Sequence, residues 1–79
     1  METRLTKNQE IALTYFMTAL EDHHFNFTQA FIWALNHFNQ YRYENEREAF
    51  RKLSTYEKNQ IMAIVTATAL GRTKEGAHS

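Results

Sequence analysis

The stretch FTQAFIWALNHFNQYR, residues 27–42, decides the fold because its apolar side chains recur at helical spacing. Asn26 stands three residues before Gln29, which is the spacing of a helix N-cap with the backbone that it caps. At about 100° per residue, the side chains that share one stripe are Phe27, Ala30, Phe31, Ala34, Phe38 and Tyr41. The pattern predicts a helix from about Phe27 to Arg42.

The same stretch carries a second apolar side, because Ile32 and Trp33 point away from that stripe. A tryptophan among tyrosines and amide side chains is typical of the centre of a protein interface. A chain of 79 residues forms a thin core, so we expect one side of this helix to remain available to a partner. The predicted partner-binding residues are Trp33, Gln29, His37, Gln40, Tyr41 and Tyr43. The alternative is a central helix whose Trp33 packs against another helix of the same chain.

An earlier helix is predicted from about Thr6 to Asp22. Thr6 and Gln9 have the spacing of a capping box. The apolar residues that then recur at i, i+3, i+4 and i+7 are Leu13, Phe16, Met17 and Leu20. Its opposite side carries Ile11, Tyr15 and Ala19, so this helix is also apolar on more than one face.

Two more helices are predicted in the second half of the chain. Residues 44–52 interleave acids and bases, which fits a short solvated helix anchored by Phe50 and Leu53. Ser54 and Glu57 form a further capping-box pattern, and the buried side of the last helix is marked by Ile61, Ile64 and Val65. The β-branched residues of 61–70 would also suit a buried strand, but no second strand exists to pair with it. Gly71 is expected to end this helix.

Helices joined by short connections are the natural fold for this chain. Proline is absent, and both glycines, Gly71 and Gly76, lie near the C-terminus. We therefore predict an all-α fold, a small bundle of three long helices plus one short helix in a single domain. Residues 1–71 form the bundle in this prediction, and residues 72–79 form a flexible polar tail.

Composition excludes several classes of protein. Nine basic residues balance nine acidic ones, so no net field attracts the chain to phosphate or to anionic membranes. The absence of cysteine excludes disulfides and thiolate zinc sites. The longest charge-free stretch, residues 23–41, is interrupted by polar side chains and is no membrane span. With no targeting segment visible, we expect a cytoplasmic protein.

The sequence offers little catalytic chemistry. A phosphate-binding glycine loop and a nucleophile motif are both absent. His23, His24 and His37 come close together if the second helix packs back on the first, but supporting carboxylates at ligand spacing are lacking. We therefore expect no metal, no cofactor and no enzymatic activity. A metal or cofactor carrier built on these histidines is the weaker alternative.

A basic cluster supports a different reading, a small helical DNA-binding transcriptional regulator. Its candidate nucleic-acid-binding residues are Arg42, Arg47, Arg51 and Lys52. The acids between and beside them, Glu44, Glu46, Glu48 and Glu57, would face the phosphates and disfavour this reading.

The function predicted from the sequence is a non-enzymatic protein–protein interaction module, a small regulator or inhibitor of the kind that phages and mobile elements encode. It is expected to bind a partner protein through the aromatic face of the second helix. The same face, with Ile11 and Tyr15 of the first helix, is expected to form a homodimer. A Trp33 side chain wholly enclosed by its own chain would remove the reason for expecting this surface.

Overall fold

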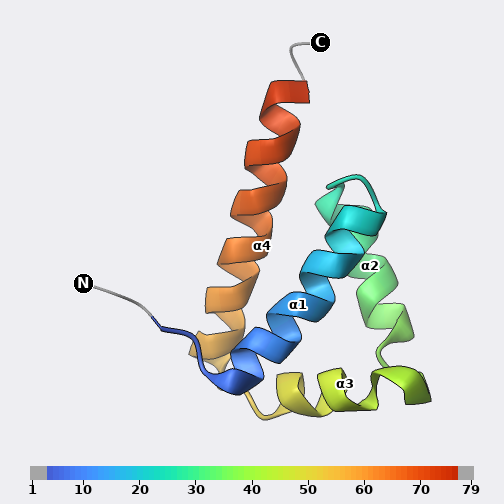
Figure 1. The fold of residues 1–79 in the computed structure, drawn as a ribbon, viewed down its shortest axis with the longest axis vertical. Helices are drawn as coiled ribbons and strands as arrows, with labels where there is room; N and C mark the ends of the chain where they lie inside the picture. The colour runs from blue at the N-terminus through green and yellow to red at the C-terminus, as the bar shows by residue number, and fades with distance from the viewer. Residues whose placement is uncertain (1–3, 77–79) are drawn as a thin grey trace.

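The computed structural model describes residues 4–76, and the side chains of residues 4–74. In this range the regular structure is all helical and consists of α1 (Lys7–Asp22), α2 (Phe27–His37), the 3-10 turn η1 (Tyr41–Tyr43), α3 (Glu44–Arg51) and α4 (Thr55–Gly76) (Figure 1). The predicted all-α bundle of three long helices and one short helix is confirmed. None of these helices is both long enough and apolar enough to span a membrane.

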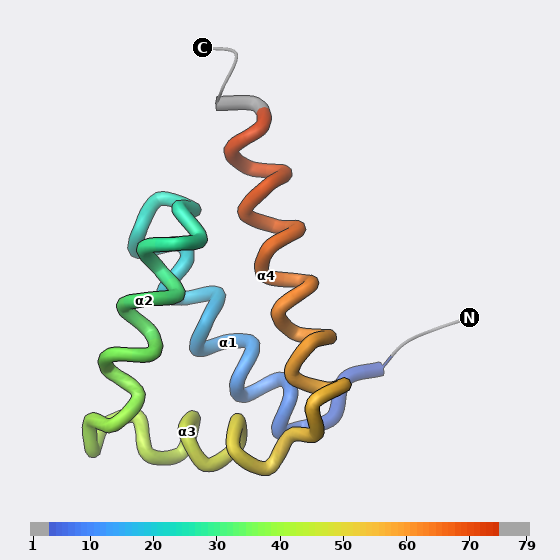
Figure 2. Tube along the Cα trace, turned by 180° about the vertical axis from the view of Figure 1, so that it is seen from behind, coloured from blue at the N-terminus to red at the C-terminus, as the bar shows by residue number. Residues whose placement is uncertain are grey.

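Helix α1 is the centre of the bundle. It lies between α2 and α4 in both views of the chain, and α3 crosses below their lower ends (Figures 1 and 2). The Cα trace measures 40 × 36 × 15 Å. Because packed helices lie about 8–10 Å apart, the short dimension admits two layers. Helix α1 packs against all three other helices, whereas α2 and α4 diverge and meet at few positions.

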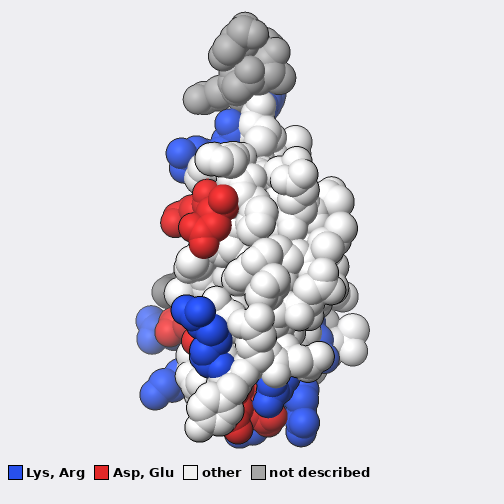
Figure 3. Space-filling view, turned by 90° about the vertical axis from the view of Figure 1, so that its right-hand side faces the viewer, with Lys and Arg blue, Asp and Glu red and all other residues white. Residues whose placement is uncertain are grey.

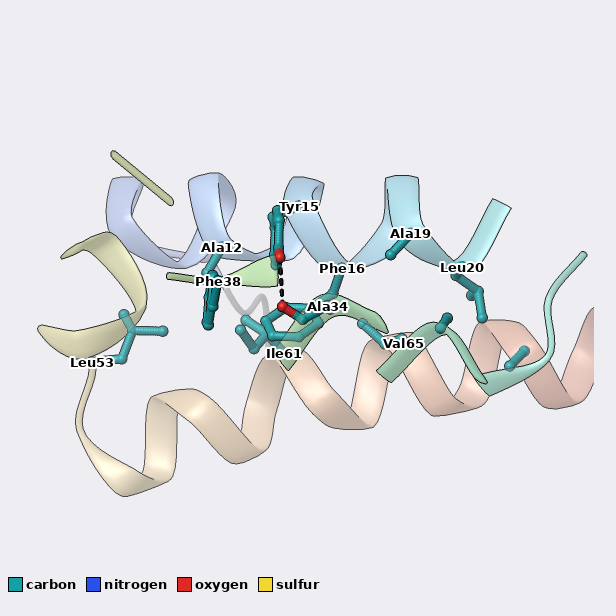
Figure 4. Close-up of a cluster of buried hydrophobic side chains, with 12 residues drawn as sticks. Ala12, Tyr15, Phe16, Ala19, Leu20, Ala34, Phe38, Leu53, Ile61 and Val65 are labelled. Carbon is teal, nitrogen blue, oxygen red and sulfur yellow. Dashed lines mark hydrogen bonds between the residues drawn. The ribbon is translucent and has the colours of Figure 1, made fainter. Parts of the chain in front are cut away.

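The core is formed on two sides of α1, which explains why that helix is apolar on more than one face. Its members are Ala12, Tyr15, Phe16, Ala19, Leu20, Ala30, Ala34, Phe38, Leu53, Ile61, Val65 and Ala69 (Figure 4). Alanines on α1 and α2 let the two backbones approach, and aromatic rings fill the remaining space. The Tyr15 and Phe38 rings stack at 4.6 Å between centroids, and the Phe16 ring packs on Phe50 at 5.5 Å. The anchoring roles predicted for Phe50 and Leu53 are confirmed.

The predicted N-terminal caps are present. Thr6 and Gln9 form a reciprocal capping box on α1, and the Asn26 side chain accepts from the Gln29 backbone N–H at the start of α2. Ser54 and Glu57 form the same reciprocal pair at the start of α4. Each cap satisfies backbone donors that a helix N-terminus leaves unpaired. Three of the four helices therefore start where local sequence dictates.

Helix α2 ends at His37, so the prediction of a helix to Arg42 was wrong. The Phe38 N–H donates to the Leu35 carbonyl at 3.4 Å, three residues back, which is the pattern of a 3-10 turn and not of an α-helix. The Ala34 carbonyl accepts instead from the Tyr15 hydroxyl at 2.6 Å, and the Phe38 carbonyl accepts from Arg47 at 3.1 Å. Tertiary donors thus satisfy the end of α2. Tyr41, predicted on the buried stripe, lies beyond the helix end and is 89% exposed.

Helix α4 continues through Gly71 to Gly76, so the prediction that Gly71 ends it was wrong. Gly71 is a normal helical position. Apart from its chain neighbours and the backbone of its own helix, no described atom lies within 4 Å of where a Cβ would stand. Residues 72–76, predicted as tail, are helical, and 77–79 lie outside the described residues. Ile61 and Val65 are buried as predicted, but Ile64 is exposed because its neighbours 61, 65 and 69 define the face toward α1.

The turn between α1 and α2 is made without glycine. His24 and Phe25 have φ of 58° and 64°, the left-handed region that side chains with a Cβ seldom occupy. The Phe25 N–H donates to the Leu20 carbonyl at 2.8 Å, which closes the end of α1 in the manner of a Schellman motif. This turn reverses the chain within four residues and brings α2 back along α1.

Candidate functional site

Trp33 is half-buried and lies at the edge of the aromatic core. The His37 ring stacks on it at 4.2 Å between centroids, and the His23 ring lies at 5.8 Å. The Tyr15 and Tyr43 rings lie at 6.3 and 6.0 Å. The chain therefore covers part of the indole and leaves part of it exposed. Trp33 is therefore not wholly enclosed by its own chain, and the reason for expecting a binding surface here remains.

A recess opens beside Trp33 on the flank of α1 that faces α2 and α3. We call it the Trp33 recess; its volume is about 160 Å³, and its lining includes Tyr15, Asp22, Trp33, Tyr43 and Glu46. Thr14 and Thr18 add hydroxyl groups along α1. Since water occupies about 30 Å³ per molecule in the liquid, the recess has room for a few water molecules or for the end of one side chain. Aromatic rings and carboxylates thus share a single hollow.

The charged groups of the Trp33 recess are both acidic. Oε1 of Glu46 is buried and accepts no hydrogen bond from any described residue. The recess is lined by Asp22 as well, and none of the described lysines, arginines or histidines lines it. Burial, followed by the nearby Tyr43 and Glu46, raises the pKa of Tyr15 to about 12. The Tyr15 hydroxyl therefore keeps its proton, which it donates to Ala34 and not to Glu46.

The structure brings together only part of the predicted partner-binding set. Trp33, His37 and Tyr43 are neighbours, because Tyr43 packs edge-on against Trp33 while His37 stacks on it. Gln29, Gln40 and Tyr41 are exposed and do not line the recess. The set itself stays a prediction.

Of the α1 residues that line the recess, sequence reasoning named Ile11 and Tyr15 and missed Thr14, Thr18 and Asp22. The signal was present in the spacing of Ile11, Thr14, Thr18 and Asp22, which fall on one face of a helix at intervals of three and four. Glu46 was assigned to the solvated charged run of α3. Only the fold places it beside α1, because its position depends on how α3 packs against α1.

The outer face of α2 carries no charged residue and exposes large apolar side chains. Ile32 is 53% exposed, and Leu35 is exposed on the same helix. Figure 3 shows the side of the molecule that contains α2 as a wide area without lysine, arginine, aspartate or glutamate, with charged groups along its left edge and at its lower end. An apolar area of this kind at a helix surface is typical of an interaction site.

A second hollow, the Phe27 groove, lies at the other end of α2. It measures about 470 Å³, and its lining includes Phe25, Phe27, Ala69 and Leu70. It lies between the α1–α2 turn and the C-terminal half of α4. The guanidinium of Arg72 sits 4.2 Å from the centre of the Phe25 ring. One hollow therefore includes Trp33 of α2, and the other includes Phe27, the first residue of that helix.

The three histidines do not converge. Nδ1 of His23 donates to the Ala19 carbonyl and Nδ1 of His37 donates to the Trp33 carbonyl, both at 2.9 Å. His24 lies on the turn and lines the Phe27 groove. Within the described part of the chain, no three side chains of the metal-ligating types gather at one place. His23 and His37 serve instead to pack against Trp33.

The basic cluster is partly engaged within the chain. Arg47 is half-buried and donates to the Phe38 carbonyl, and Arg51 pairs with Glu48 at 3.7 Å on the surface of α3. Arg42 lies 5.2 Å from the centre of the Tyr43 ring, and Lys52 is exposed. The four side chains therefore do not present one uniform positive face.

Comparison with protein-family models, with curated proteins and with solved structures gives no match to this chain.

Proposed function

We propose that the protein is a non-enzymatic binding module, a small regulator or inhibitor that docks on a partner protein through α2 and the Trp33 recess. The observation that carries this proposal is the juxtaposition of a charge-free helix face with a recess whose rim holds a half-buried tryptophan. Tryptophan and tyrosine at the centre of a desolvated patch supply most of the binding energy in protein interfaces. The outer face of α2 and the Trp33 recess would therefore act by covering a surface of the partner protein.

Ile32 supports the proposal independently of the recess. A large aliphatic side chain that is 53% exposed in the middle of a helix gains from burial against a partner. Ile32 does not belong to the hydrophobic core cluster. Its substitution therefore separates a role in binding from a role in folding.

A second copy of the chain is the other occupant that the sequence suggests. Near-zero net charge does not oppose self-association. Tyr15, expected to join such an interface, is buried in the core with its hydroxyl committed to Ala34, so any homodimer contact would come from α2 and Ile11 alone. Sedimentation at micromolar concentration distinguishes a dimer from a monomer that binds a different protein.

The experiment compares the wild-type chain with Ile32→Asp and with Tyr56→Asp as the matched control on α4, where Tyr56 is 71% exposed. Each is used to capture proteins from cells of the source organism, and the captured protein is then purified and titrated by calorimetry. We expect a partner that binds the wild type and the Tyr56 variant equally and loses at least about tenfold in affinity for the Ile32 variant. A captured set and affinities that do not differ between the three chains would overturn the proposal.

The DNA-binding alternative is tested by titrating the chain into duplex DNA at two salt concentrations. Phosphate contacts give a steep loss of affinity as salt rises. Since Arg47 and Arg51 already have partners in the chain, we expect no such binding. Salt-dependent binding that disappears in an Arg42→Gln, Lys52→Gln variant would favour the regulator over the module.

A further inference from the structure

The geometry points to the Trp33 recess as a receptor for one arginine side chain of the partner protein. This inference rests on the proposed function, because it names the chemistry by which that function would recognise its partner. Four features of the recess carry it: its rings, its carboxylates, the absence of basic side chains among the described residues of its lining, and its size.

Three aromatic rings line the recess, and each already packs on a neighbour: His37 stacks on Trp33, Phe38 stacks on Tyr15, and Arg42 lies over Tyr43. A ligand would meet the ring surface that these neighbours leave uncovered. Trp33 and Tyr43 stand nearly perpendicular, at 78° and 6.0 Å between centroids, and Tyr15 and Tyr43 meet at 63° and 5.1 Å. The face of an indole or phenol ring is electron-rich and attracts a cation within about 6 Å. Tyr43 already holds the Arg42 guanidinium 5.2 Å from its centre, so this ring engages guanidinium within its own chain.

In the part of the chain that the structure describes, neither carboxylate of the recess forms an ion pair. Oε1 of Glu46 is buried without a donor, although the residue as a whole is only half-buried. Because Glu46 lines the recess, a rotation of its side chain would turn this unused hydrogen-bonding capacity toward a ligand there. Asp22 adds a second negative charge to the lining. A half-buried carboxylate gains most from a donor that also carries positive charge.

The basic side chains near Glu46 do not neutralise it. Arg47 directs its guanidinium to the Phe38 carbonyl at 3.1 Å, and Arg42 lies over Tyr43. Among residues 5–74, no lysine or arginine forms an ion pair with Glu46. The recess therefore combines negative charge with aromatic walls. No basic side chain of the described residues lines it, although Arg42 lies over the Tyr43 ring.

Arginine fits this combination better than lysine. A guanidinium is planar, stacks on aromatic rings and forks onto a carboxylate with two N–H groups, whereas an ammonium is a compact, strongly hydrated charge. The volume of about 160 Å³ accommodates a guanidinium with part of its methylene chain. The apolar part of that chain would lie on the Ile11 side of the recess.

The test uses the intrinsic fluorescence of Trp33, the single tryptophan of the chain, which lines the recess. The probe is N-acetyl-arginine amide, and N-acetyl-citrulline amide is the neutral control of nearly equal shape. We expect a saturable change with the arginine probe and at least about tenfold weaker binding of the citrulline probe, because the charge is removed while the stacking plane is kept. Equal binding of the two probes, or no saturable change with arginine, would overturn the proposal.

Two variants locate the site. Glu46→Gln should weaken the arginine probe at least about tenfold, and Glu48→Gln on the same helix, where Glu48 pairs with Arg51, should leave it unchanged. Circular dichroism verifies that both variants fold, and Asp22→Asn, on an exposed residue, provides a second measurement should Glu46→Gln be unfolded. Binding by an Arg42→Gln variant but not by the wild type would show that the chain's own arginine fills the recess, which would also overturn the proposal.

The outcome separates this inference from the proposed function. If the recess binds arginine but the Ile32→Asp variant retains every partner, the arginine site is supported and the proposed binding module is refuted. A partner that is lost with Ile32→Asp yet bound equally by Glu46→Gln leaves the module standing and refutes the arginine assignment.

Discussion

The hydroxyl of Tyr15 on α1 donates a 2.6 Å hydrogen bond to the carbonyl oxygen of Ala34 on α2 (Figure 4). The Ala34 carbonyl belongs to the last turn of α2, where a helix has no N–H of its own to offer. One phenol therefore closes the end of one helix, joins it to another and forms a wall of the Trp33 recess.

Removing this hydroxyl should destabilise the fold. In Tyr15→Phe the buried Ala34 carbonyl loses its donor while the stacked ring remains, so we expect a loss of about 1 to 2 kcal/mol in the free energy of unfolding. In a domain of this size that corresponds to a fall in Tm of roughly 4–8 °C per kcal/mol. Thermal unfolding followed by circular dichroism measures it. Tyr56→Phe, on an exposed tyrosine, is the control, and equal Tm values for the two variants would contradict the assignment.

Alkaline pH should weaken the fold through the same residue. The pKa of Tyr15 is raised from 10.0 to about 12, by burial first and then by Tyr43 and Glu46. Between these values the unfolded chain has lost a proton that the folded chain still holds, so the stability contributed by Tyr15 is complete below pH 10 and declines as pH rises toward 12. Urea unfolding across this range, compared with Tyr15→Phe, measures the decline. A decline of equal steepness in the two chains would count against the raised pKa.

Gln9 joins the starts of α1 and α4. It is 2% exposed, and its Nε2 donates to the Glu57 carbonyl at 3.2 Å and to Oε1 of Gln60 at 2.8 Å. Gln9→Glu would turn a carboxylate oxygen toward these two acceptors, so we expect a loss of about 2 kcal/mol or more at neutral pH.

Acid should restore part of this loss, because protonation returns a donor to residue 9 and the folded state raises the pKa of the new carboxyl. Urea unfolding at neutral and at acidic pH tests both statements. Asn59→Asp, on an exposed residue of α4, serves as the control and should change little. A Gln9→Glu chain as stable as the wild type at neutral pH would show that these hydrogen bonds contribute nothing.

Gly71 should be replaceable with a gain in stability. It lies inside α4. Apart from its chain neighbours and the backbone of its own helix, no described atom stands within 4 Å of the place that an added methyl group would occupy, so alanine meets no clash and lowers the entropy of the unfolded chain. We expect Gly71→Ala to add about 0.5–1 kcal/mol to the free energy of unfolding. Ala67→Gly, at an exposed position one turn earlier, should remove a similar amount. No change in either variant would indicate that α4 is frayed from residue 67 onward.

Local chemistry was sufficient to predict where helices begin. The side-chain oxygens of Thr6, Asn26 and Ser54 cap backbone N–H groups within three residues, and such short-range bonds form whatever the rest of the fold does. Periodicity likewise identified Phe16 and Leu20 as core, because a 3.6-residue repeat places them on one face.

The ends of α2 and α4 were predicted wrongly for two different reasons. Residues far away in the sequence determine where α2 ends, and nothing around Gly71 forces α4 to end there. Tyr15 and Arg47 satisfy the last carbonyls of α2 from 19 and 9 residues away. Gly71 stays helical because nothing in its surroundings requires another conformation. Neither fact is encoded in the adjacent residues.

By itself, the sequence determined the helical class, the helix starts and the main core positions, since these depend on contacts within one or two turns. The tertiary structure alone decided that α1, and not α2, is covered on several sides, and that Glu46 of a charged helix lines the same recess as Trp33. Periodicity states which faces of a helix are apolar. Which of those faces finds a neighbour depends on how the helices cross, and that depends on packing between residues far apart in the chain.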